Sequence, residues 1–316
     1  MRAVLKNAYG IQLRYPAAGG EGMNKAQKGA AALFAAYFLW GAMPLYWKML
    51  EHISSFEILC HRVAWSALFT AILLAARRQV RYAVDFVRRE PKKALTLCAG
   101  GFMIAFNWGM YIWGINHGHV LECSLGYYIN PLVSMFLGLV FFREKMDRLQ
   151  TAALLLAAAG VTVELIAVHS IPILSLGLAL TFGLYGALKK AIPIDSSASL
   201  CIETISVTPA ALVCLFWLQH AGYAAFPYDP LTFLLLAGAG ITTAFPLILF
   251  AYGAKNVRMT TMGFIQYTSP TLLFILGTFL YNEPLRRSRV LTFIFIWAAL
   301  AVYGYDTIKK EHTRLQ

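Results

Sequence analysis

Ten apolar blocks, each about 20 residues long, dominate this 316-residue sequence. Crossing the hydrocarbon core of a bilayer takes about 20 mostly apolar residues in a helix. Open sheets cannot cross lipid, and barrel strands would alternate apolar with polar residues, which these blocks do not. The sequence therefore predicts an all-α polytopic membrane protein with ten transmembrane helices. We place them at about 29–50, 56–76, 94–115, 120–142, 149–168, 171–188, 199–218, 231–253, 260–281 and 289–308.

The basic residues are distributed unevenly around these blocks. A net charge of +12 would by itself be compatible with nucleic-acid binding. However, 22 of the 27 Lys and Arg residues lie on one side of the membrane if the N-terminus is inside. This positive-inside pattern predicts that both termini lie in the cytoplasm and that the protein has no nucleic-acid partner. The loop at Arg286–Arg289 departs from the charge rule.

The two ends of the chain lie outside the apolar blocks. Residues 1–28 lack the apolar stretch of 7–15 residues that a signal peptide contains. Met23 opens the string MNKAQKGAAALFAAYFLWG, which resembles a natural start. We interpret Met23 as the true start, with a cytoplasmic N-terminal tail as the alternative. Residues 309–316 are predicted to form a cytoplasmic C-terminal tail.

Part of the second half of the chain resembles part of the first half at an offset of 139 residues. Residues 101–144 align without a gap with residues 240–283, and nine of the 44 positions are identical. Gly and Pro are costly inside helices, so matched Gly and Pro indicate matched backbone geometry. The identical pairs include Gly114 and Gly253, Tyr128 and Tyr267, Pro131 and Pro270, and Glu144 and Glu283.

The repeat predicts the architecture. Residues 29–168 form a first five-helix repeat and residues 171–308 a second. Five is an odd number, so the second repeat enters the membrane from the opposite side and the repeats are inverted. Inverted repeats are typical of secondary transporters, whose substrate site lies near the midplane between the repeats.

Two shorter strings show a weaker likeness between the halves. Leu39-Trp40-Gly41 resembles Thr181-Phe182-Gly183, in the first and sixth predicted helices. In the second and seventh, Phe56-Glu57-Ile58 resembles Ile202-Glu203-Thr204. This alignment pairs Glu57 with Glu203 across the repeat.

The string FEILCHRVAW, residues 56–65, carries three ionisable groups inside an apolar block. A charge at the bilayer centre costs about 2.5–3.5 kcal/mol, so such groups usually face a cavity or a partner. Glu57, His61 and Trp65 are spaced four residues apart and share one helix face. We expect Glu57 and His61 to border a water-accessible cavity, with Arg62 directed at a neighbouring helix. A structural ion pair is the alternative.

Other polar residues within the blocks are further candidates. Glu122 and Glu203 are interpreted either as substrate or coupling carboxylates or as structural groups. Tyr128 and Tyr267 precede the matched prolines by one turn, and Asn107 lies at mid-depth. The tryptophans are interpreted as membrane-interface or packing residues. The predicted substrate-binding or coupling residues are Glu57, His61, Arg62, Trp65, Asn107, Tyr111, Glu122, Tyr128, Asn130, Glu203 and Tyr267.

Motifs of enzymes and of ATP-driven pumps are absent. The string HGH at 117–119 has no partner at metal-ligand spacing, and LAGAGI at 236–241 lacks the Lys of a nucleotide loop. The five cysteines show no CxxC spacing and are interpreted as small buried hydrophobes. We therefore expect no cofactor and no metal. An ion gradient or the substrate's own gradient would drive transport, with Glu57, Glu122 or Glu203 as coupling carboxylate.

Several strings together carry a family resemblance over residues 26–306. They are FLWGAMPLYWK, FEILCHRVAW, NHGHVLECSLGYYINPL, FGLYGALKK, GFIQYTSPTLLF and FIWAALAVY, with Pro followed 13 residues later by Glu in the fourth and ninth helices. In these features the chain resembles the RarD group of the EamA family, within the drug/metabolite transporter superfamily. The resemblance implies an inner-membrane permease that exports small molecules. The group is described by association with chloramphenicol sensitivity and has no defined substrate.

The function expected from the sequence is secondary transport of a small organic solute by alternating access. The solute is an amino-acid-like metabolite or an amphiphilic drug, and the lipid bilayer is the other partner. Two alternatives stay open: a membrane-embedded enzyme or receptor, and a passive channel or lipid flippase. The sequence is compatible with either a monomer or a homodimer.

Overall fold

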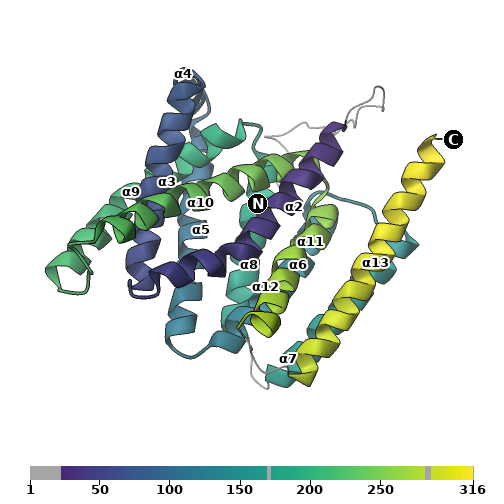
Figure 1. The fold of residues 1–316 in the computed structure, drawn as a ribbon. Coiled ribbons are helices and arrows are strands. Elements are labelled where there is room, and N and C mark those ends of the chain that lie inside the picture. The colour runs from purple at the N-terminus through teal and green to yellow at the C-terminus, as the bar shows by residue number, and fades with distance from the viewer. Residues whose placement is uncertain (1–22, 169–171, 282–285, 316) are drawn as a thin grey trace.

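The computed structural model describes residues 23–168, 172–281 and 286–315, and helices dominate that part of the chain (Figure 1). Nine of the described helices are long and apolar enough to cross a membrane. These nine helices come from both of the predicted five-helix repeats. Their bounds are α2 Lys25–Trp47, α3 Ser55–Ala76, α5 Pro91–Asn116, α6 Val120–Phe141, α7 Arg148–Val168, α8 Ile173–Ala191, α9 Ser196–His220, α10 Pro230–Asn256 and α13 Arg287–Leu315.

The predicted crossing at 260–281 is present but interrupted. It consists of α11 (Met259–Gln266) and α12 (Thr268–Phe279), which meet at Tyr267. The break lies beside the first turn of α12, where Pro270 has no N–H to donate to the Gln266 carbonyl four residues earlier. The Tyr267 N–H donates instead to the Phe264 carbonyl at 3.2 Å, a tighter turn than that of an α-helix. The predicted tenth helix is therefore two short helices.

Two faces of the molecule are distinguished by the chain ends. We call the face at which α2 begins and α13 ends the terminal face, which lies at the top of Figure 1, and the other the opposite face. A helix outside the ten predicted crossings, α4 (Val80–Arg89), lies at the terminal face. Its apolar and basic side chains lie on different sides of the helix, a pattern typical of helices that rest on a membrane surface.

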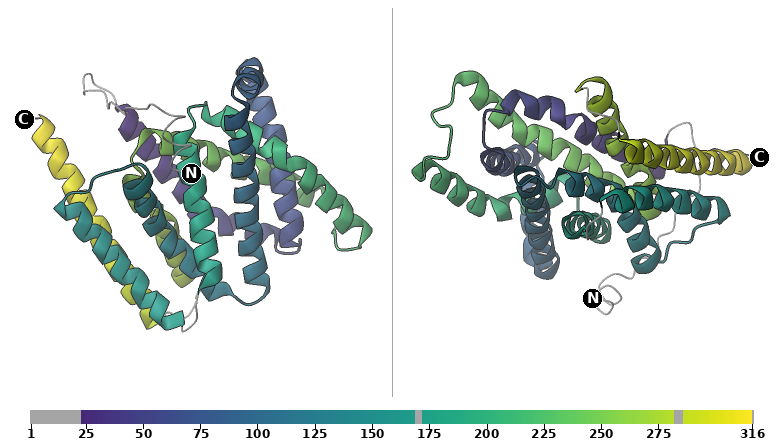
Figure 2. Two further views of the ribbon diagram at one scale, coloured as in Figure 1. Left: turned by 180° about the vertical axis from the view of Figure 1, so that it is seen from behind. Right: turned by 90° about the horizontal axis from the view of Figure 1, so that it is seen from below.

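The two halves interlock and do not form separate bundles. In the first half, α2 packs against α10 and α12 of the second. In the second half, the equivalent helix α8 packs against α5 and α6 of the first. The helix α3 packs against its own equivalent α9, and α7 packs against α13 along one edge of the molecule (Figure 2). Exchanging the halves leaves this set of helix pairs unchanged, as a pseudo-two-fold axis requires.

Glycine contacts support the same symmetry at the level of single residues. A Cβ added at Gly41 in α2 would lie 2.9 Å from Leu272 Cβ in α12. A Cβ added at Gly183 in α8 would lie 2.7 Å from Val133 Cγ1 in α6. Val133 and Leu272 are 139 residues apart, the offset of the sequence repeat. Equivalent glycines therefore allow equivalent helix crossings on the two sides of the axis.

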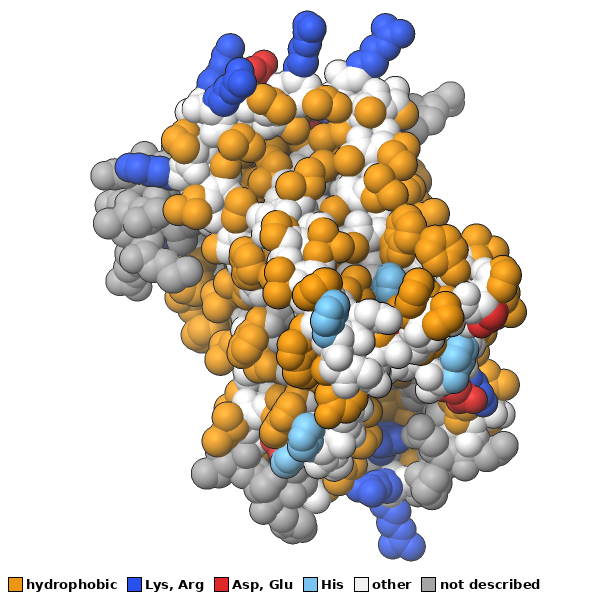
Figure 3. Space-filling model, turned by 90° about the vertical axis from the view of Figure 1, so that its left-hand side faces the viewer, with side chains coloured by type: hydrophobic (Ala, Val, Ile, Leu, Met, Phe, Trp, Pro, Cys, Tyr) orange, Lys and Arg blue, Asp and Glu red, His pale blue; other side chains and the backbone are white. Residues whose placement is uncertain are grey.

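The outer surface is largely hydrophobic. Large apolar side chains are exposed on several helices, for example Leu155 on α7 (64%) and Val213 on α9 (69%). Figure 3 shows a broad hydrophobic surface below the Lys and Arg side chains at the top edge. Soluble monomers rarely expose apolar patches of this extent. The chain is therefore a multi-pass membrane protein, as the apolar blocks predict.

Candidate functional site

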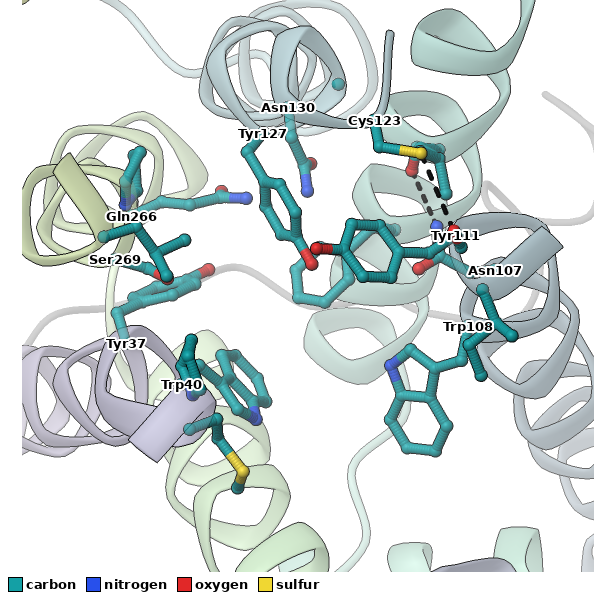
Figure 4. A pocket seen from close by; sticks show the side chains of 18 of the residues that line it. Tyr37, Trp40, Asn107, Trp108, Tyr111, Cys123, Tyr127, Asn130, Gln266 and Ser269 are labelled. Atoms are coloured by element: carbon teal, nitrogen blue, oxygen red, sulfur yellow. Dashed lines mark hydrogen bonds between the residues drawn. The ribbon is translucent and has the colours of Figure 1, made fainter. Parts of the chain in front are cut away.

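A central cavity of about 170 Å³ lies among helices from both halves (Figure 4). One ordered water molecule needs roughly 10–15 Å³ of such space, so the cavity accommodates a small organic molecule. Side chains from α2, α3, α5 and α6 meet side chains from α8, α11 and α12 around it. The cavity thus lies at the interface between the repeats.

The cavity is open towards the opposite face. Its lining residues come from the parts of the helices that run from the middle of the molecule to that face, such as 107–112 in α5 and 123–130 in α6. Tyr127 lines the cavity and still keeps 37% of its surface accessible. The position of the lining therefore places the opening of the cavity on the side of the opposite face.

Equivalent positions of the two repeats line the cavity together. Tyr127 and Asn130 in α6 correspond, at the offset of 139, to Gln266 in α11 and Ser269 in α12. Trp40 in α2 likewise faces its counterpart Phe182 in α8, with ring centroids 5.8 Å apart. The pseudo-symmetry of the fold therefore extends to the site, although the paired side chains differ in chemistry.

Two buried polar atoms in the lining have no hydrogen-bond partner among the described residues. They are the Tyr37 hydroxyl and the Asn130 Oδ1, on side chains that are 2% and 5% exposed. Buried polar groups are almost always paired, because an unpaired one loses its hydration without compensation. Both side chains line the cavity (Figure 4), although the two oxygen atoms are themselves enclosed by their neighbours. They make the cavity a candidate binding site.

Arg62 supplies the positive charge of the cavity. Its guanidinium carbon lies 4.8 Å from the ring centroid of Trp47 and 4.4 Å from that of Trp108. Its Nε donates a hydrogen bond to Thr243 Oγ1 at 2.9 Å. In the described parts of the chain no carboxylate forms an ion pair with Arg62. Cation–π contacts thus stabilise this charge without neutralising it.

Aromatic rings close the cavity towards the terminal face. Phe250 in α10 is fully buried at the centre of this layer. Its ring centroid lies 6.0 Å from that of Tyr37, 5.5 Å from that of Phe182 and 5.9 Å from that of Tyr185. The layer belongs to the largest buried cluster of the described residues. It separates the cavity from the terminal face.

A buried ion pair lies beyond this aromatic layer. Lys189 near the end of α8 donates a hydrogen bond to the carboxylate of Glu203 in α9, and both side chains are buried. Ser199 connects to both partners, accepting from Lys189 at 2.9 Å and donating to Glu203 at 3.0 Å. The Tyr185 hydroxyl donates to the other Glu203 oxygen at 3.0 Å. This network joins α8 to α9 on the terminal-face side.

A second charged cluster closes the same side. The Glu144 carboxylate accepts hydrogen bonds from the backbone N–H groups of Met259, at 2.7 Å, and Thr260, at 2.9 Å. These are free N–H groups of the first turn of α11, where a negative charge is favourable. Lys190 lies 4.0 Å and Arg258 3.8 Å from the same carboxylate. The cluster joins the segment after α6 to α11.

The structure brings four of the predicted site residues together in the cavity lining. They are Arg62, Asn107, Tyr111 and Asn130. Asn107 also fastens α5 to α8, because its amide donates to the Leu178 carbonyl at 2.8 Å and to Thr181 Oγ1 at 2.7 Å. The ring of Tyr111 lies 5.5 Å from that of Tyr127.

Glu57, His61 and Trp65 lie outside this lining. The Glu57 carboxylate accepts hydrogen bonds from the Ala225 N–H at 3.1 Å and from the Tyr228 hydroxyl at 2.5 Å. His61 Nε2 lies 3.0 Å from the same hydroxyl. Their helix face therefore holds the loop between α9 and α10, whereas Arg62, about 140° further round the helix from Glu57, faces the cavity.

The remaining predicted residues also lie elsewhere. Glu203 belongs to the buried ion pair, and Glu122 lies near the opposite face, 2.9 Å from His119 Nδ1. Trp65 packs against Phe233 in α10, with ring centroids 5.7 Å apart. Tyr128 contacts Phe293 in α13 at 5.6 Å, and the Tyr267 hydroxyl donates to the Tyr128 carbonyl at 3.4 Å. The two matched tyrosines thus lie side by side, away from the cavity.

The sequence analysis missed several lining residues. Three tryptophans that were interpreted as interface or packing residues line the cavity: Trp40, Trp47 and Trp108. Tyr37, Tyr127, Gln266 and Ser269 were not singled out, although the last two lie one to four residues before Pro270. Aligning polar residues across the repeat near the matched prolines would have indicated Asn130 with Ser269.

A polytopic helical protein whose interlocked inverted repeats surround a polar cavity with aromatic walls has the architecture of a membrane transporter. The sequence profile of the EamA-like transporter family matches residues 27–165 and again residues 169–305. The chain therefore belongs to the EamA-like transporter family, and its relatives place it in the RarD group.

Relatives cover nearly the whole chain. It is 42% identical over 285 residues to the uncharacterized transporter YojE of Bacillus subtilis, covering 90% of this chain and 95% of that protein. It is 39% identical to the protein RarD of Escherichia coli, covering 89% and 95%. The chloramphenicol-sensitive protein RarD of Pseudomonas aeruginosa is 30% identical, with coverage of 89% and 95%. A solved crystal structure with a TM-score of 0.66 and 16% identity, covering 87% of this chain and 96% of that one, supports the fold alone.

Proposed function

We propose that this protein is a secondary transporter of the cytoplasmic membrane that exports a small organic metabolite or drug-like solute by alternating access. The observation that carries the proposal is the central cavity, which is open to the opposite face and closed to the terminal face. Helices of both repeats build the cavity and its closed end. This is one of the two states that alternating access requires.

The distribution of charge supports a cytoplasmic terminal face. Among the described residues, Lys and Arg are frequent at the terminal face, whereas histidines are frequent at the opposite face. Arg287 and Arg289, at the opposite face, depart from the positive-inside rule. Positive charge is retained on the cytoplasmic side during insertion. Basic residues of the terminal face are Arg81, Arg88, Arg89, Lys92, Lys93, Arg143, Lys145 and Arg148.

The closed end is built from contacts that can be exchanged. Beyond the aromatic layer it consists of ion pairs and hydrogen bonds, centred on Glu203 and Glu144. Water can replace such contacts when the helices separate, without a large exposure of apolar surface. The pseudo-two-fold axis supports a second state in which equivalent helices close the opposite face. Coupling to a proton or another ion gradient remains a prediction from the sequence.

The nature of the cargo is supported by cavity size and by relatives. The lining combines aromatic rings with a few polar groups, a composition typical of small-molecule sites. Related proteins carry the names transporter and chloramphenicol-sensitive protein. We therefore propose a small organic solute as the cargo.

Comparative metabolomics of the growth medium tests the proposal. Cells would express the wild type, an Asn130→Leu/Ser269→Leu variant that removes polar groups from the cavity, or a Thr162→Leu control. Thr162 lies exposed on α7, so the control makes a similar change on the lipid side. We expect at least one compound to accumulate outside only with the wild type and the control. The proposal is overturned if all three strains, at equal membrane levels, leave identical media in repeated growth conditions.

A further inference from the structure

We propose that the cavity recognises a small organic monoanion, whose carboxylate binds Arg62 and whose apolar or aromatic body lies against the tryptophan walls. The inference rests on the proposed function, because it names the class of cargo for the same site. It starts from Arg62, the cation that the cavity presents without an acidic partner in the described chain.

The charge balance of the cavity favours an anion. The lining contains one guanidinium and, among the described residues, no Asp or Glu. A charge removed from bulk water is expensive unless it is paired. An anionic ligand neutralises Arg62 on binding, whereas a cationic ligand would place a second positive charge in the same enclosed volume. A single cation balances one negative charge, so a monoanion fits better than a dianion.

The geometry of Arg62 leaves the carboxylate-binding end of its guanidinium available. The Nε–H is bound to Thr243 Oγ1 at 2.9 Å, which fixes the plane of the group. No described residue accepts a hydrogen bond from its two Nη atoms. The two Nη groups present parallel N–H donors, a fork that matches the two oxygens of a carboxylate. The ring contacts to Trp47 and Trp108 further restrict the side chain.

The rest of the cavity defines the other end of the ligand. Trp40, Trp108 and Phe182 provide aromatic surface for an apolar body. The Asn130 Oδ1 and the Tyr37 hydroxyl have no hydrogen-bond partner among the described residues. After a small side-chain rotation that exposes them to the cavity, Asn130 Oδ1 can accept a hydrogen bond from the ligand, and the Tyr37 hydroxyl can donate or accept one. These two groups are uncharged and suit a hydroxyl, amide or carbonyl. The expected ligand is therefore amphiphilic, with its charge at Arg62 and a neutral polar group near Asn130.

Binding of three compounds that share one ring tests the inference. Phenylacetate is anionic at neutral pH, phenylacetamide is neutral and phenethylamine is cationic. Their binding to the purified full chain would be followed by the fluorescence of the cavity tryptophans. The variants are Arg62→Gln, which removes the charge, Arg62→Lys, which keeps the charge without the fork, and Arg88→Gln on α4 as a control outside the cavity.

A charge-assisted bidentate contact predicts that the wild type binds phenylacetate at least about tenfold more tightly than phenylacetamide, and phenethylamine most weakly. The Arg62→Gln variant should reduce this ratio to about one, because phenylacetate loses its charge-assisted contact. We expect Arg62→Lys to be intermediate and Arg88→Gln to match the wild type. Equal affinities in the wild type, a ratio unaffected by Arg62→Gln, or binding of none of the three compounds would overturn the inference.

The outcome is separable from that of the proposed function. If the metabolomic experiment finds a cargo that is neutral or cationic, the protein is a transporter and the anion inference is overturned. If the media are identical but phenylacetate binds through Arg62, the anion site stands and the transport proposal is overturned.

Discussion

Gly101 in α5 and Gly240 in α10 occupy equivalent positions of the two repeats and allow equivalent close helix contacts. A Cβ added at Gly101 would lie 2.7 Å from the Glu203 carbonyl oxygen in α9. A Cβ added at Gly240 would lie 2.5 Å from the backbone carbonyl carbon of Trp65 in α3. Each glycine thus brings its helix against the backbone of a helix from the other half.

This relationship changes the alignment of the second and seventh predicted helices. The short strings around Glu57 and Glu203 paired these two glutamates. The glycine contacts instead make Glu203 the repeat equivalent of Trp65, because each meets the equivalent glycine. Their offset of 138 residues agrees with the 139 of the longer repeat. A match of three residues in apolar helices is too short to fix a register. Glu57 and Glu203 therefore do not occupy equivalent positions.

We predict that Gly101→Ala and Gly240→Ala each destabilise the protein by about 1–3 kcal/mol, because the added methyl group meets backbone atoms that cannot move aside alone. Gly109→Ala in α5 is the matched control, since a Cβ there meets nothing within 4 Å. Thermal unfolding of the purified protein in detergent measures the effect. Equal stability of all three variants would show that the close crossings are absent.

The buried pair of Lys189 and Glu203 predicts a non-additive effect. Lys189→Met leaves the Glu203 carboxylate buried without its partner, which should destabilise the protein by about 3–5 kcal/mol. Adding Glu203→Leu should recover most of this loss, because two apolar side chains then fill the same space. A double-mutant cycle measured by unfolding provides the test. Lys93→Met is a control at the more exposed contact with Glu90, where about 0–1 kcal/mol is expected. Additive losses would contradict the buried network.

The environment of Tyr228, in the loop after α9, predicts that the stability of the protein depends on pH. Burial, together with its hydrogen bond to Glu57, raises the pKa of Tyr228 above its ordinary value of 10.0. The folded state therefore keeps the hydroxyl proton where the unfolded chain loses it, and this contribution to stability is lost as the pH rises above about 10. We expect unfolding curves of Tyr228→Phe to lose less stability than the wild type between about pH 10 and 11.

The same variant has a second expected effect. At neutral pH it removes one hydrogen bond to Glu57, so its free energy of unfolding should fall by about 1 kcal/mol or more. Parallel losses of stability with pH in the two proteins would mean that the hydroxyl is not held by Glu57.

The sequence was sufficient for the architecture because membrane crossing leaves a strong signal. Long apolar blocks and the matched Gly and Pro predicted the helices and their repeat. The break at Tyr267 was not predicted. A proline alone does not indicate such a break, since Pro131, the repeat equivalent of Pro270, lies within a continuous α6. The effect of a proline depends on its neighbours in space. The interlocking of the halves depends on contacts between distant segments and was likewise not readable from local sequence.

The site was harder to predict because charge inside a helix indicates a partner without identifying it. Glu57 and Arg62 are five residues apart, yet one holds a loop and the other faces the cavity. The same difficulty explains why the three cavity tryptophans were interpreted as interface or packing residues, since lipid, protein and cavity surfaces all accept an indole ring. Only the arrangement of neighbouring helices decides among these surfaces. Asn130, which adjoins the matched Pro131, is among the predicted residues that do line the cavity.

Access to the cavity from each side of the membrane tests the central claim most directly. A Tyr127→Cys variant without the five native cysteines would be labelled with a membrane-impermeant maleimide, separately from each side, with and without Glu203→Gln. A Leu155→Cys variant on the lipid-facing side of α7 serves as a background control. Alternating access predicts reciprocal changes: weakening the closed end should raise labelling from the terminal face and lower it from the opposite face. Labelling that rises from both sides together, or that does not respond from the terminal face, would contradict the account.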